Sequence, residues 1–340
     1  MTHKKKILLV YTNYSTFVRT DYEILSGEFE VIRHPVLFGK GILNHFRGFL
    51  KQFIFLLFNC RKFDVYYIWF ADSHSFLPVF FSNISGKKSL LVNGGYDVAR
   101  ITKYGYGVFC SRMRGFLAAK SMRNCTLNLP VSRFVARKVK AITHNEKYRV
   151  IYNCVNLSGK LPSIRPERKT VLTVGLIDSE RDYKIKGIDT FAEVARLLPH
   201  IPFCVVGLNK DKLEHHVNLF PPNLQVIDSL PHEELIGLYL EAKIYCQLSR
   251  VESFGVALAE AVSYGCIPLI TNEGAMPELV NDRQFQAKRE INQIKEKIQF
   301  FYSGDEIQGL ALLKERIEKE FSLNARAESI LNAVHASWIA

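Results

Sequence analysis

Short apolar runs alternate with longer amphipathic segments along the whole chain. The runs have the length and residue types of buried β-strands, and they span residues 6–12, 28–33, 64–70, 88–93, 125–130, 148–151, 169–174, 202–206, 224–227, 244–248 and 267–271. Segments of helical length separate most of them, including 187–198, 209–219, 232–241 and 254–264. Because strands that alternate with helices form parallel sheets with helices on both faces, the pattern predicts an α/β protein.

One segment interrupts this alternation and divides the chain. Residues 157–169 hold a glycine, two prolines and mostly polar side chains, which is typical of a linker. The length of 340 residues also suits two domains, each with its own core. We predict a first domain over residues 1–157, a linker over 158–168 and a second domain over 169–322. A helical tail without strands occupies 306–336.

Charge is distributed unevenly between the two halves. Residues 1–160 carry 25 Lys and Arg against 8 Asp and Glu, a net charge of +17, whereas the remainder carries 20 against 25, a net charge of −5. A basic half joined to an acidic half indicates an anionic partner: a nucleic acid, a phospholipid or a phosphorylated substrate. The alternative is that the charge serves solubility alone.

The sequence shows neither a secretory signal peptide nor a pattern of disulfide-forming or zinc-binding cysteines. Its first apolar run follows a basic start directly and is far shorter than a secretory signal. The seven cysteines are scattered without a C-x-x-C pair, so neither a disulfide framework nor a zinc site is predicted. The mean hydropathy of 0.00 is typical of a globular protein, and the cysteine usage suits a reducing cytosol, so a cytoplasmic protein is expected.

Missing glycines exclude two common classes of nucleotide-binding enzyme. The first strand is followed by residues 11–17, which lack the G-x-G-x-x-G that a dinucleotide oxidoreductase needs. No G-x-x-x-x-G-K-S/T of a P-loop NTPase exists elsewhere. The basic half has no RNA- or DNA-binding signature either, so we predict no nucleic-acid partner.

Two glutamates in the second half carry the candidate chemistry. Residues 254–262 predict a helix that is apolar on every side except at Glu260, and a carboxylate there must be hydrogen-bonded or open to a polar ligand. Ser253 is the expected N-cap, which turns the next three amides outward at the positive end of the helix dipole, where a phosphate binds well. Glu252 lies beside this end. The alternative is structural: Glu252 caps the helix and Glu260 pairs with a lysine.

The spacing of these residues resembles a known signature. Glu252-x7-Glu260, with Phe254-Gly255 between and Gly265-x-Ile267-Pro268 after, resembles the E-x7-E motif of glycosyltransferase family 4, the group 1 retaining GT-B enzymes. Further segments match in order and spacing over about residues 148–335: Ser249, Thr271-x-x-Gly274-x-x-Pro277-Glu278, Val174-Gly175, Lys186-Gly187 and Val205-Val206-Gly207. The resemblance implies a GT-B fold, with two Rossmann-like domains facing across a cleft, the first binding the acceptor and the second the nucleotide-sugar donor. It also implies that a final helix at 323–340 packs back on the first domain.

The resemblance also implies a role for each matched residue. Glu260 would hold the ribose hydroxyls of the donor, Glu252 would bond the ring hydroxyls of the donor sugar, and Lys186 would neutralise the departing diphosphate. The remaining donor-binding positions are Gly175, Gly207, Ser253, Phe254, Gly255 and Val256. The implied reaction moves a hexose or related sugar from a UDP- or GDP-sugar with retention at the anomeric carbon.

Two positions depart from the family pattern. The usual arginine after the first glycine is Leu176 here, and we expect Arg181 or Lys184 to replace the missing cation unless Lys186 acts alone. Ala275 replaces the second glycine of a G-G pair, which is a mild change. No D-x-D motif indicates a metal-bound diphosphate, so we expect no metal and no cofactor beyond the donor. The alternatives are a nucleotide-sugar epimerase or phosphorylase of the same fold, or a binding subunit with weak turnover.

The basic first half is expected to bind the acceptor. Asp97 follows two glycines at the end of the fourth predicted strand, and it is a candidate catalytic residue or, equally, a turn residue; His74 is a rival polar group. The most apolar helical stretch, residues 53–58, is too short to span a bilayer. The longer segment 43–61, with its interspersed basic residues, can lie in a membrane interface. The basic positions assigned to acceptor or membrane contact are Arg47, Lys51, Lys62, Arg100 and Lys103. We therefore predict peripheral binding to the inner membrane face and a lipid-linked or saccharide acceptor, in cell-surface polysaccharide or glycolipid synthesis.

Overall fold

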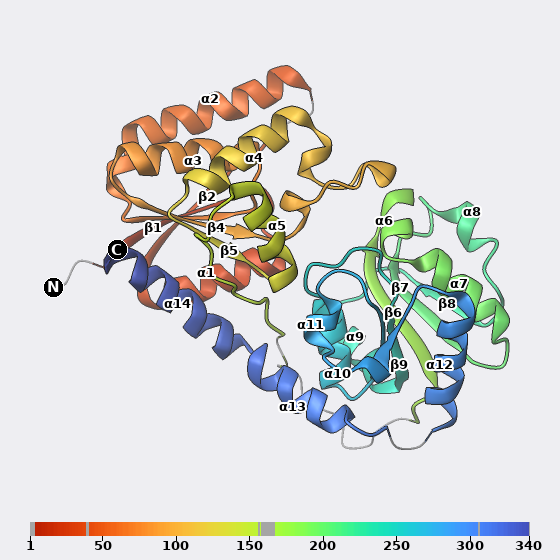
Figure 1. The fold of residues 1–340 in the computed structure, drawn as a ribbon. Coiled ribbons are helices and arrows are strands. Elements are labelled where there is room, and N and C mark those ends of the chain that lie inside the picture. The colour runs from red at the N-terminus through yellow and green to blue at the C-terminus, as the bar shows by residue number, and fades with distance from the viewer. Residues whose placement is uncertain (1–3, 39–40, 156, 158–166, 305–306, 340) are drawn as a thin grey trace. The chain divides into compact units, whose positions relative to one another are not determined.

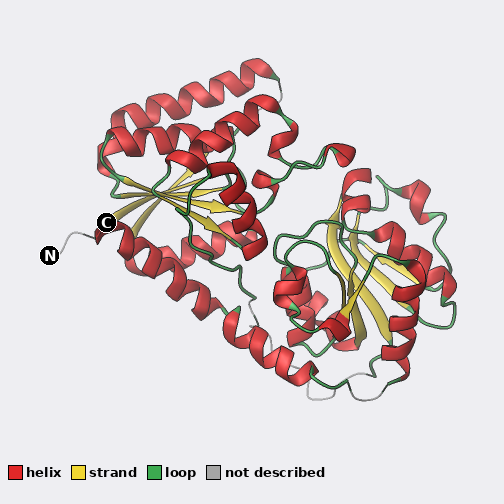
Figure 2. Cartoon of the chain, viewed as in Figure 1, coloured by secondary structure: helices red, strands yellow, loops and turns green. Residues whose placement is uncertain are grey.

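The computed structural model describes residues 4–38, 41–155, 157, 167–304 and 307–339 (Figure 1). The chain forms two compact units, the first made of Met1–Asn153 and Asn324–Ala340 and the second of Cys154–Leu323. Each unit is a parallel sheet with helices on both faces (Figure 2), so the α/β prediction is confirmed. Residues 158–166 of the predicted linker lie outside the described residues.

The sheet of the first unit has the strand order β2-β1-β3-β4-β5, and all of its described pairings are parallel. Its strands are β1 Lys6–Tyr11, β2 Glu30–Pro35, β3 Val65–Trp69, β4 Lys88–Asn93 and β5 Leu127–Pro130. Ile7 of β1 lies opposite Val31 on one side and Val65 on the other. The central strands β1 and β3 are buried nearly throughout because helices cover both faces of the sheet.

Helices enclose this sheet. They are α1 Thr16–Glu28, α2 Ile42–Asn59, α3 Ser73–Ile84, α4 Arg112–Asn124, α5 Arg133–Thr143 and α14 Leu323–Ile339, with short 3-10 turns at Cys60–Lys62, Tyr96–Val98, Thr102–Tyr104 and Val108–Cys110. Figure 1 shows α2, α3 and α4 together over one face of the sheet, and α1 with α14 on the opposite face. Leu56 of α2 and Ile330 of α14 both contribute to the hydrophobic core of this unit.

The second unit has a sheet of order β11-β10-β9-β6-β7-β8, again parallel. Its strands are β6 Thr170–Ile177, β7 Phe203–Leu208, β8 Leu224–Ile227, β9 Ala242–Gln247, β10 Ile267–Thr271 and β11 Gln286–Ala287. Its helices are α6 Glu180–Ile185, α7 Ile188–Leu197, α8 Glu214–Val217, α9 His232–Glu241, α10 Val256–Ser263, α11 Met276–Leu279, α12 Ile291–Ser303 and α13 Leu310–Glu320, with a 3-10 turn at Arg283–Phe285.

Two predicted elements are wrong. Residues 148–151 do not form a strand, and Tyr148 makes only an isolated bridge with Asn128 at the edge of β5. The helix predicted over 209–219 is confined to α8, because Asn209 bonds the amide of Lys212 through its side chain and favours a turn before the helix. The strands that were predicted around these segments are confirmed within about two residues at most ends.

Candidate functional site

The matched segments of the second unit lie at the carboxyl ends of its strands. β6 leads to β7 on one side of the sheet and β9 leads to β10 on the other, so the strand order reverses between β6 and β9. Ligands of open parallel sheets bind outside the strand ends at such a reversal. Gly175 lies near the end of β6 and Ser249 lies two residues after β9, so the sequence signatures meet at this point.

The two glycines of the site have different roles. Gly207 has φ of 87°, and a Cβ there would lie 2.1 Å from the carbonyl oxygen of Gly175, so only glycine lets β6 and β7 approach this closely. A Cβ at Gly175 itself would meet only the Lys186 side chain, at an ordinary 3.5 Å. The protein therefore has room for a side chain at Gly175, which is consistent with space kept for a ligand beside Lys186.

Lys186 and Glu252 form an ion pair. The Lys186 Nζ lies 2.9 Å from Glu252 Oε2, although the two residues are 66 positions apart in the chain. Their side chains keep 28% and 17% of their surface exposed, so both groups remain accessible to a ligand. Gly187 after the lysine has φ of 72° and lies against Leu248, where a Cβ would be 2.0 Å from the carbonyl oxygen. The Lys-Gly pair thus fixes the lysine beside the end of β9.

The backbone around Glu252 is held by the loop after β10. Ala275 donates its amide hydrogen to the Glu252 carbonyl at 2.9 Å, and the adjacent Gly274 approaches that carbonyl so closely that a Cβ would lie 2.2 Å away. Ser253 donates its amide hydrogen to the Glu252 carboxylate at 3.1 Å. Because the contact of Ala275 uses its backbone, replacing the usual second glycine by alanine preserves it.

The helix after Glu252 begins two residues later than predicted. α10 begins at Val256 with Gly255 as its N-cap, and Ser253 makes no capping hydrogen bond, so the predicted Ser253 cap is wrong. The reason is the φ of 98° at Gly255, a left-handed conformation that ends the helical geometry and that favours glycine. Phe254 is buried and packs edge-to-face on Phe321 at 5.4 Å. The free amides at the helix start are therefore those from Val256 onward.

Glu260 is a buried carboxylate in an otherwise apolar helix. It is 8% exposed, and Tyr239 of α9 donates its hydroxyl hydrogen to Glu260 Oε2 at 3.2 Å. Burial raises the pKa of Glu260. In the described part of the chain the carboxylate of Glu260 is bonded by Tyr239 and not by a lysine, so the lysine pairing considered as an alternative is not found there. A carboxylate kept in this setting is costly to the fold, which is consistent with a ligand-binding role.

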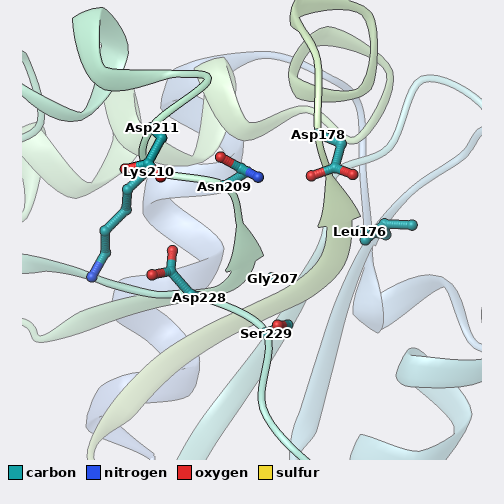
Figure 3. Close-up of a pocket in the computed structure, with 8 residues that line it drawn as sticks. All are labelled: Leu176, Asp178, Gly207, Asn209, Lys210, Asp211, Asp228 and Ser229. Atoms are coloured by element: carbon teal, nitrogen blue, oxygen red, sulfur yellow. The ribbon is translucent and has the colours of Figure 1, made fainter.

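A pocket of about 280 Å³ opens next to Gly175, between Leu176 and Gly207 (Figure 3). It is lined by Leu176, Asp178, Gly207, Asn209, Lys210, Asp211, Asp228 and Ser229. Most of these residues directly follow β6, β7 and β8, so the pocket lies at the carboxyl ends of the strands. Its polar lining was not predicted, although the position of Asp228 immediately after the predicted strand 224–227 was a usable signal.

The two cations that were expected to replace the missing arginine, Arg181 and Lys184, both form ion pairs. Leu176 is 73% exposed at the pocket. Arg181 pairs with Asp182 at 3.3 Å, and Lys184 pairs with Asp189 at 3.2 Å. Lys210, which was not predicted, lines the pocket together with Leu176.

In the first unit, Asp97 is a structural carboxylate. It has no exposed surface, and it accepts hydrogen bonds from the amides of Ala71 at 3.0 Å and Gly95 at 2.7 Å. Burial raises its pKa to about 6. The turn interpretation fits this geometry and the catalytic one does not, because no oxygen of Asp97 is open to a substrate. His74 is likewise buried, with Nε2 2.8 Å from the Trp69 carbonyl oxygen.

The first unit carries an exposed apolar surface over α2, α3 and α4. Exposed side chains on α2 are Leu43, Phe46, Leu50, Phe53, Ile54, Leu57 and Phe58, and they are joined by Phe80, Ile84, Met113 and Phe116 of α3 and α4. Arg47, Lys51 and Lys62 are exposed on or directly after α2, and Arg100 and Lys103 are exposed between β4 and α4. Within the described ranges, no helix is both long and apolar enough to cross a bilayer.

Comparison with known proteins supports this interpretation of the second unit. Residues 162–319 match the family model of the glycosyl transferases group 1. The chain is 25% identical over 150 residues to the phosphatidylinositol N-acetylglucosaminyltransferase gpi3 subunit of Schizosaccharomyces pombe, covering 42% of this chain and 32% of that protein. It is 28% identical over 148 residues to a phosphatidylinositol N-acetylglucosaminyltransferase subunit from Arabidopsis thaliana, covering 40% and 32%. The chain thus matches about a third of the length of these relatives, and residues 162–319, nearly all in the second unit, are similar to the group 1 glycosyl transferases.

Solved structures show the fold of the whole chain. A sucrose-phosphate synthase from Thermosynechococcus elongatus superposes with a TM-score of 0.78 at 15% identity, over 99% of this chain and 100% of that one. Anabaena Alr3699/HepE in complex with UDP and glucose superposes with a TM-score of 0.73 at 13% identity, over 98% and 100%. The predicted GT-B fold is confirmed.

Proposed function

We propose that the protein is a glycosyltransferase that moves a hexose or related sugar from a UDP- or GDP-sugar to a lipid-linked or glycan acceptor, with retention at the anomeric carbon. The observation that carries this proposal is the pairing of Lys186 with Glu252 at the strand reversal of the second unit, beside Gly175. Lys186 would stabilise the diphosphate as it departs, and Glu252 would bond the sugar hydroxyls. Donor binding would then draw Lys186 from Glu252 toward the diphosphate.

The reaction is proposed to need no metal ion. A fixed ammonium group at Lys186 and the free amides from Val256 onward supply positive charge where the diphosphate would lie. Lys210 in the adjacent pocket adds a second cation, which would offset the leucine at position 176.

The donor is identified by a thermal-shift screen of nucleotides and nucleotide sugars. A ligand at 100 times its Kd stabilises the folded protein by about 2.7 kcal/mol, which is enough to rank UDP, GDP and their sugars. Product analysis with the best donor then separates the alternatives. Transfer to an acceptor with retention supports the proposal, an epimerised donor indicates an epimerase, and a phosphate-dependent sugar phosphate indicates a phosphorylase. Donor binding with neither sugar transfer nor donor hydrolysis indicates a binding subunit. The leucine at position 176, where the family usually has arginine, would then explain the missing activity.

Glu260→Gln is expected to weaken nucleotide binding by about tenfold or more, because a charge-assisted hydrogen bond to the ribose is lost. The melting temperature should change little, since glutamine has the same shape and can still accept a hydrogen bond from Tyr239. Isothermal titration calorimetry with UDP and GDP measures the effect, and Glu234→Gln on the exposed side of α9 is the control. Equal affinity of Glu260→Gln and wild type would refute the ribose assignment.

The second part of the proposal is peripheral binding to anionic membranes through the α2–α4 surface. This surface combines exposed aromatic and aliphatic side chains with Arg47, Lys51 and Lys62. The opposite side of α2 packs on its own unit through the buried Leu56, so the exposed residues are not needed for that packing. Such amphipathic helices bind at the headgroup boundary, and each nearby basic residue adds about 1 kcal/mol.

Reversal of Arg47, Lys51 and Lys62 to glutamate is expected to lower affinity for anionic vesicles by at least about 100-fold at low salt, since about 1 kcal/mol is lost for each charge removed. Co-sedimentation with phosphatidylserine vesicles measures this loss. The control reverses Arg133, Arg137 and Lys140 on α5, which changes the net charge equally at another place in the same unit. Nucleotide affinity should survive both triple substitutions. Docking through α2 would be ruled out if the wild-type protein does not bind anionic vesicles at low salt, or if both triple variants lose the same vesicle affinity.

A further inference from the structure

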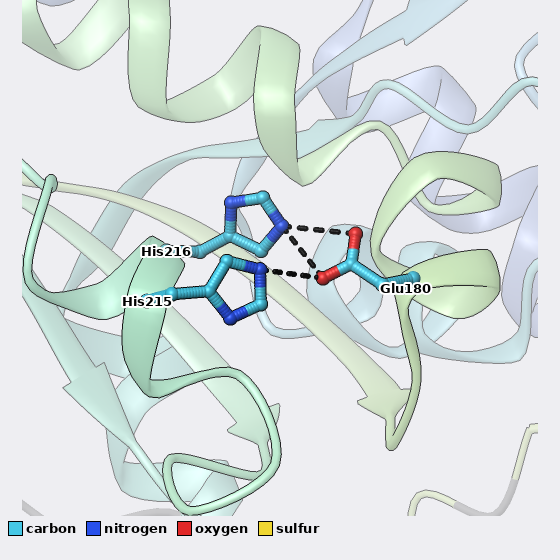
Figure 4. A group of neighbouring side chains, drawn as sticks. All are labelled: Glu180, His215 and His216. Carbon is cyan, nitrogen blue, oxygen red and sulfur yellow. Dashed lines mark hydrogen bonds and ion pairs between the residues drawn. The ribbon is translucent and has the colours of Figure 1, made fainter.

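Three metal-ligating side chains meet away from the Lys186–Glu252 pair (Figure 4). Glu180 is the first residue of α6, and it faces two consecutive histidines of α8. His215 Nε2 lies 2.8 Å from Glu180 Oε1, and His216 Nε2 lies 2.9 Å from Oε1 and 3.0 Å from Oε2. In the part of the chain that the structure describes, this group of His, Cys, Asp or Glu has its three ligand atoms within 4.8 Å of one another.

Both imidazole rings are oriented before any ligand arrives. His216 stacks on Tyr183 of α6, with ring centroids 3.9 Å apart and an interplanar angle of 8°, and Tyr183 is itself buried. Neighbouring side chains of a regular helix point about 100° apart. In the short helix α8, however, the rings of His215 and His216 lie 4.1 Å apart, and both direct Nε2 at the same carboxylate, as Figure 4 shows. Packing therefore holds two nitrogen ligands on one side of one carboxylate.

We propose that Glu180, His215 and His216 form a zinc site, with water as the fourth ligand. Two imidazoles, one carboxylate and a water form a ligand set that Zn²⁺ takes in proteins. Mg²⁺ and Ca²⁺ prefer oxygen ligands only, so the two nitrogens select a transition metal. Tetrahedral coordination at about 2.0–2.2 Å separates the ligand atoms by roughly 3.3–3.5 Å. The present nitrogen–oxygen separations near 3 Å must therefore open slightly, which the exposed side chains of Glu180 and His215 permit. Each histidine must carry its hydrogen on Nδ1.

An ion at this position would link two walls of the pocket described above. Asp178 precedes Glu180 by two residues, and Lys210 precedes His215 by five, so the two ligand-bearing segments each contribute to the pocket lining. Lys212 and Asp178 already form a salt bridge between these segments at 3.6 Å. The zinc ion would fix the segment from β6 to α6 against the segment from β7 to α8. Its role is structural, and the inference does not rest on the proposed sugar transfer.

The test is a calorimetric titration of ZnCl₂ into untagged, metal-stripped protein at neutral pH, without nucleotide. Wild type is expected to bind one equivalent, and His215→Ala and Glu180→Gln are expected to lower the affinity by at least about tenfold. His200→Ala removes an exposed histidine elsewhere in the same unit and should leave the affinity unchanged. Because the substituted groups are exposed, circular dichroism should show all variants folded. No binding by wild type at about 1 mM Zn²⁺, or equal affinity of wild type and His215→Ala, overturns the proposal.

Cobalt(II) and hydrogen exchange provide independent readouts. Co²⁺ in a four-coordinate site gives a strong visible absorption, which should appear in wild type and disappear in His215→Ala. Zn²⁺ should also slow amide exchange in residues 178–183 and 209–216 of wild type. Exchange that is unchanged by bound Zn²⁺ would contradict the link between the two segments, and equally tight binding of Mg²⁺ would contradict the zinc assignment. Neither readout depends on donor binding, so failure here leaves the proposed activity intact, and the reverse also holds.

Discussion

Replacing Lys186 with methionine is expected to lower the turnover number for sugar transfer by about 10²–10³-fold, the usual scale for losing one preorganised charge-stabilising group. Negative charge develops on the diphosphate as the bond between it and the donor sugar breaks. Lys186 is positioned at the strand reversal by Gly187 and Glu252. Methionine retains the length of the side chain and removes its charge. Steady-state kinetics with the donor identified by the thermal-shift screen measure both kcat and KM.

Lys184→Met is the matched control for this substitution. Lys184 lies two residues earlier, is 40% exposed and is already paired with Asp189 at 3.2 Å, so little loss of turnover is expected. Methionine at 186 also removes the counter-charge of Glu252. Kinetics and melting temperatures of the double variant Lys186→Met/Glu252→Gln, compared with those of Lys186→Met, separate this effect from the loss of catalysis. Equal losses at positions 184 and 186 would contradict the assignment of Lys186. Activity lost in EDTA and restored by Mg²⁺ would contradict the metal-independent mechanism.

The position of the candidate site could be predicted because its signatures are local. Gly175 directly follows the predicted strand 169–174, and Lys186 and Glu252 lie shortly before the predicted helices 187–198 and 254–264. The carboxyl ends of parallel strands meet at one edge of a sheet. Their mutual geometry could not be predicted. The ion pair between residues 186 and 252 depends on the register of β6 and β9 and on close backbone contacts at Gly187 and Gly274, which residue types alone do not specify.

The errors have a common physical cause, which is the competition of local geometry with residue type. Ser253 is of a residue type that caps helices well. The left-handed backbone of Gly255 nevertheless makes Gly255 the N-cap, so that α10 begins at Val256, two residues later than predicted. Asp97 follows two glycines as a ligand-binding residue does, yet its carboxylate already accepts hydrogen bonds from the amide of Gly95 in its own turn and from the amide of Ala71 after β3. The Glu180–His215–His216 cluster was missed because its members come from two helices separated by α7 and β7, and α8 is much shorter than the pattern predicted.

A buried ion pair joins the C-terminal helix to the core of the first unit. Arg326 of α14 donates to both carboxylate oxygens of Asp21 in α1, each at 2.8 Å, and to the carbonyl oxygen of Tyr152 at 2.7 Å. Asp21 also accepts hydrogen bonds from the Tyr67 hydroxyl at 2.8 Å and the Trp69 indole at 2.9 Å. The side chains are 3% and 0% exposed. Each charge is therefore satisfied by protein groups, so removing one partner exposes the full cost of burying the other.

Arg326→Met is accordingly expected to lower the free energy of unfolding by about 3–5 kcal/mol, because it leaves the Asp21 carboxylate buried without a counter-charge. Thermal and urea unfolding at neutral pH measure the loss, and Arg19→Met, which breaks an exposed pair with Glu23, should cost less than about 1 kcal/mol. The double variant Asp21→Asn/Arg326→Met should be more stable than Arg326→Met alone. It removes the lone charge, and the asparagine carbonyl can still accept hydrogen bonds from Tyr67 and Trp69. If the double variant is less stable than the single one, the cost lies in lost packing of α14 and not in the unpaired carboxylate.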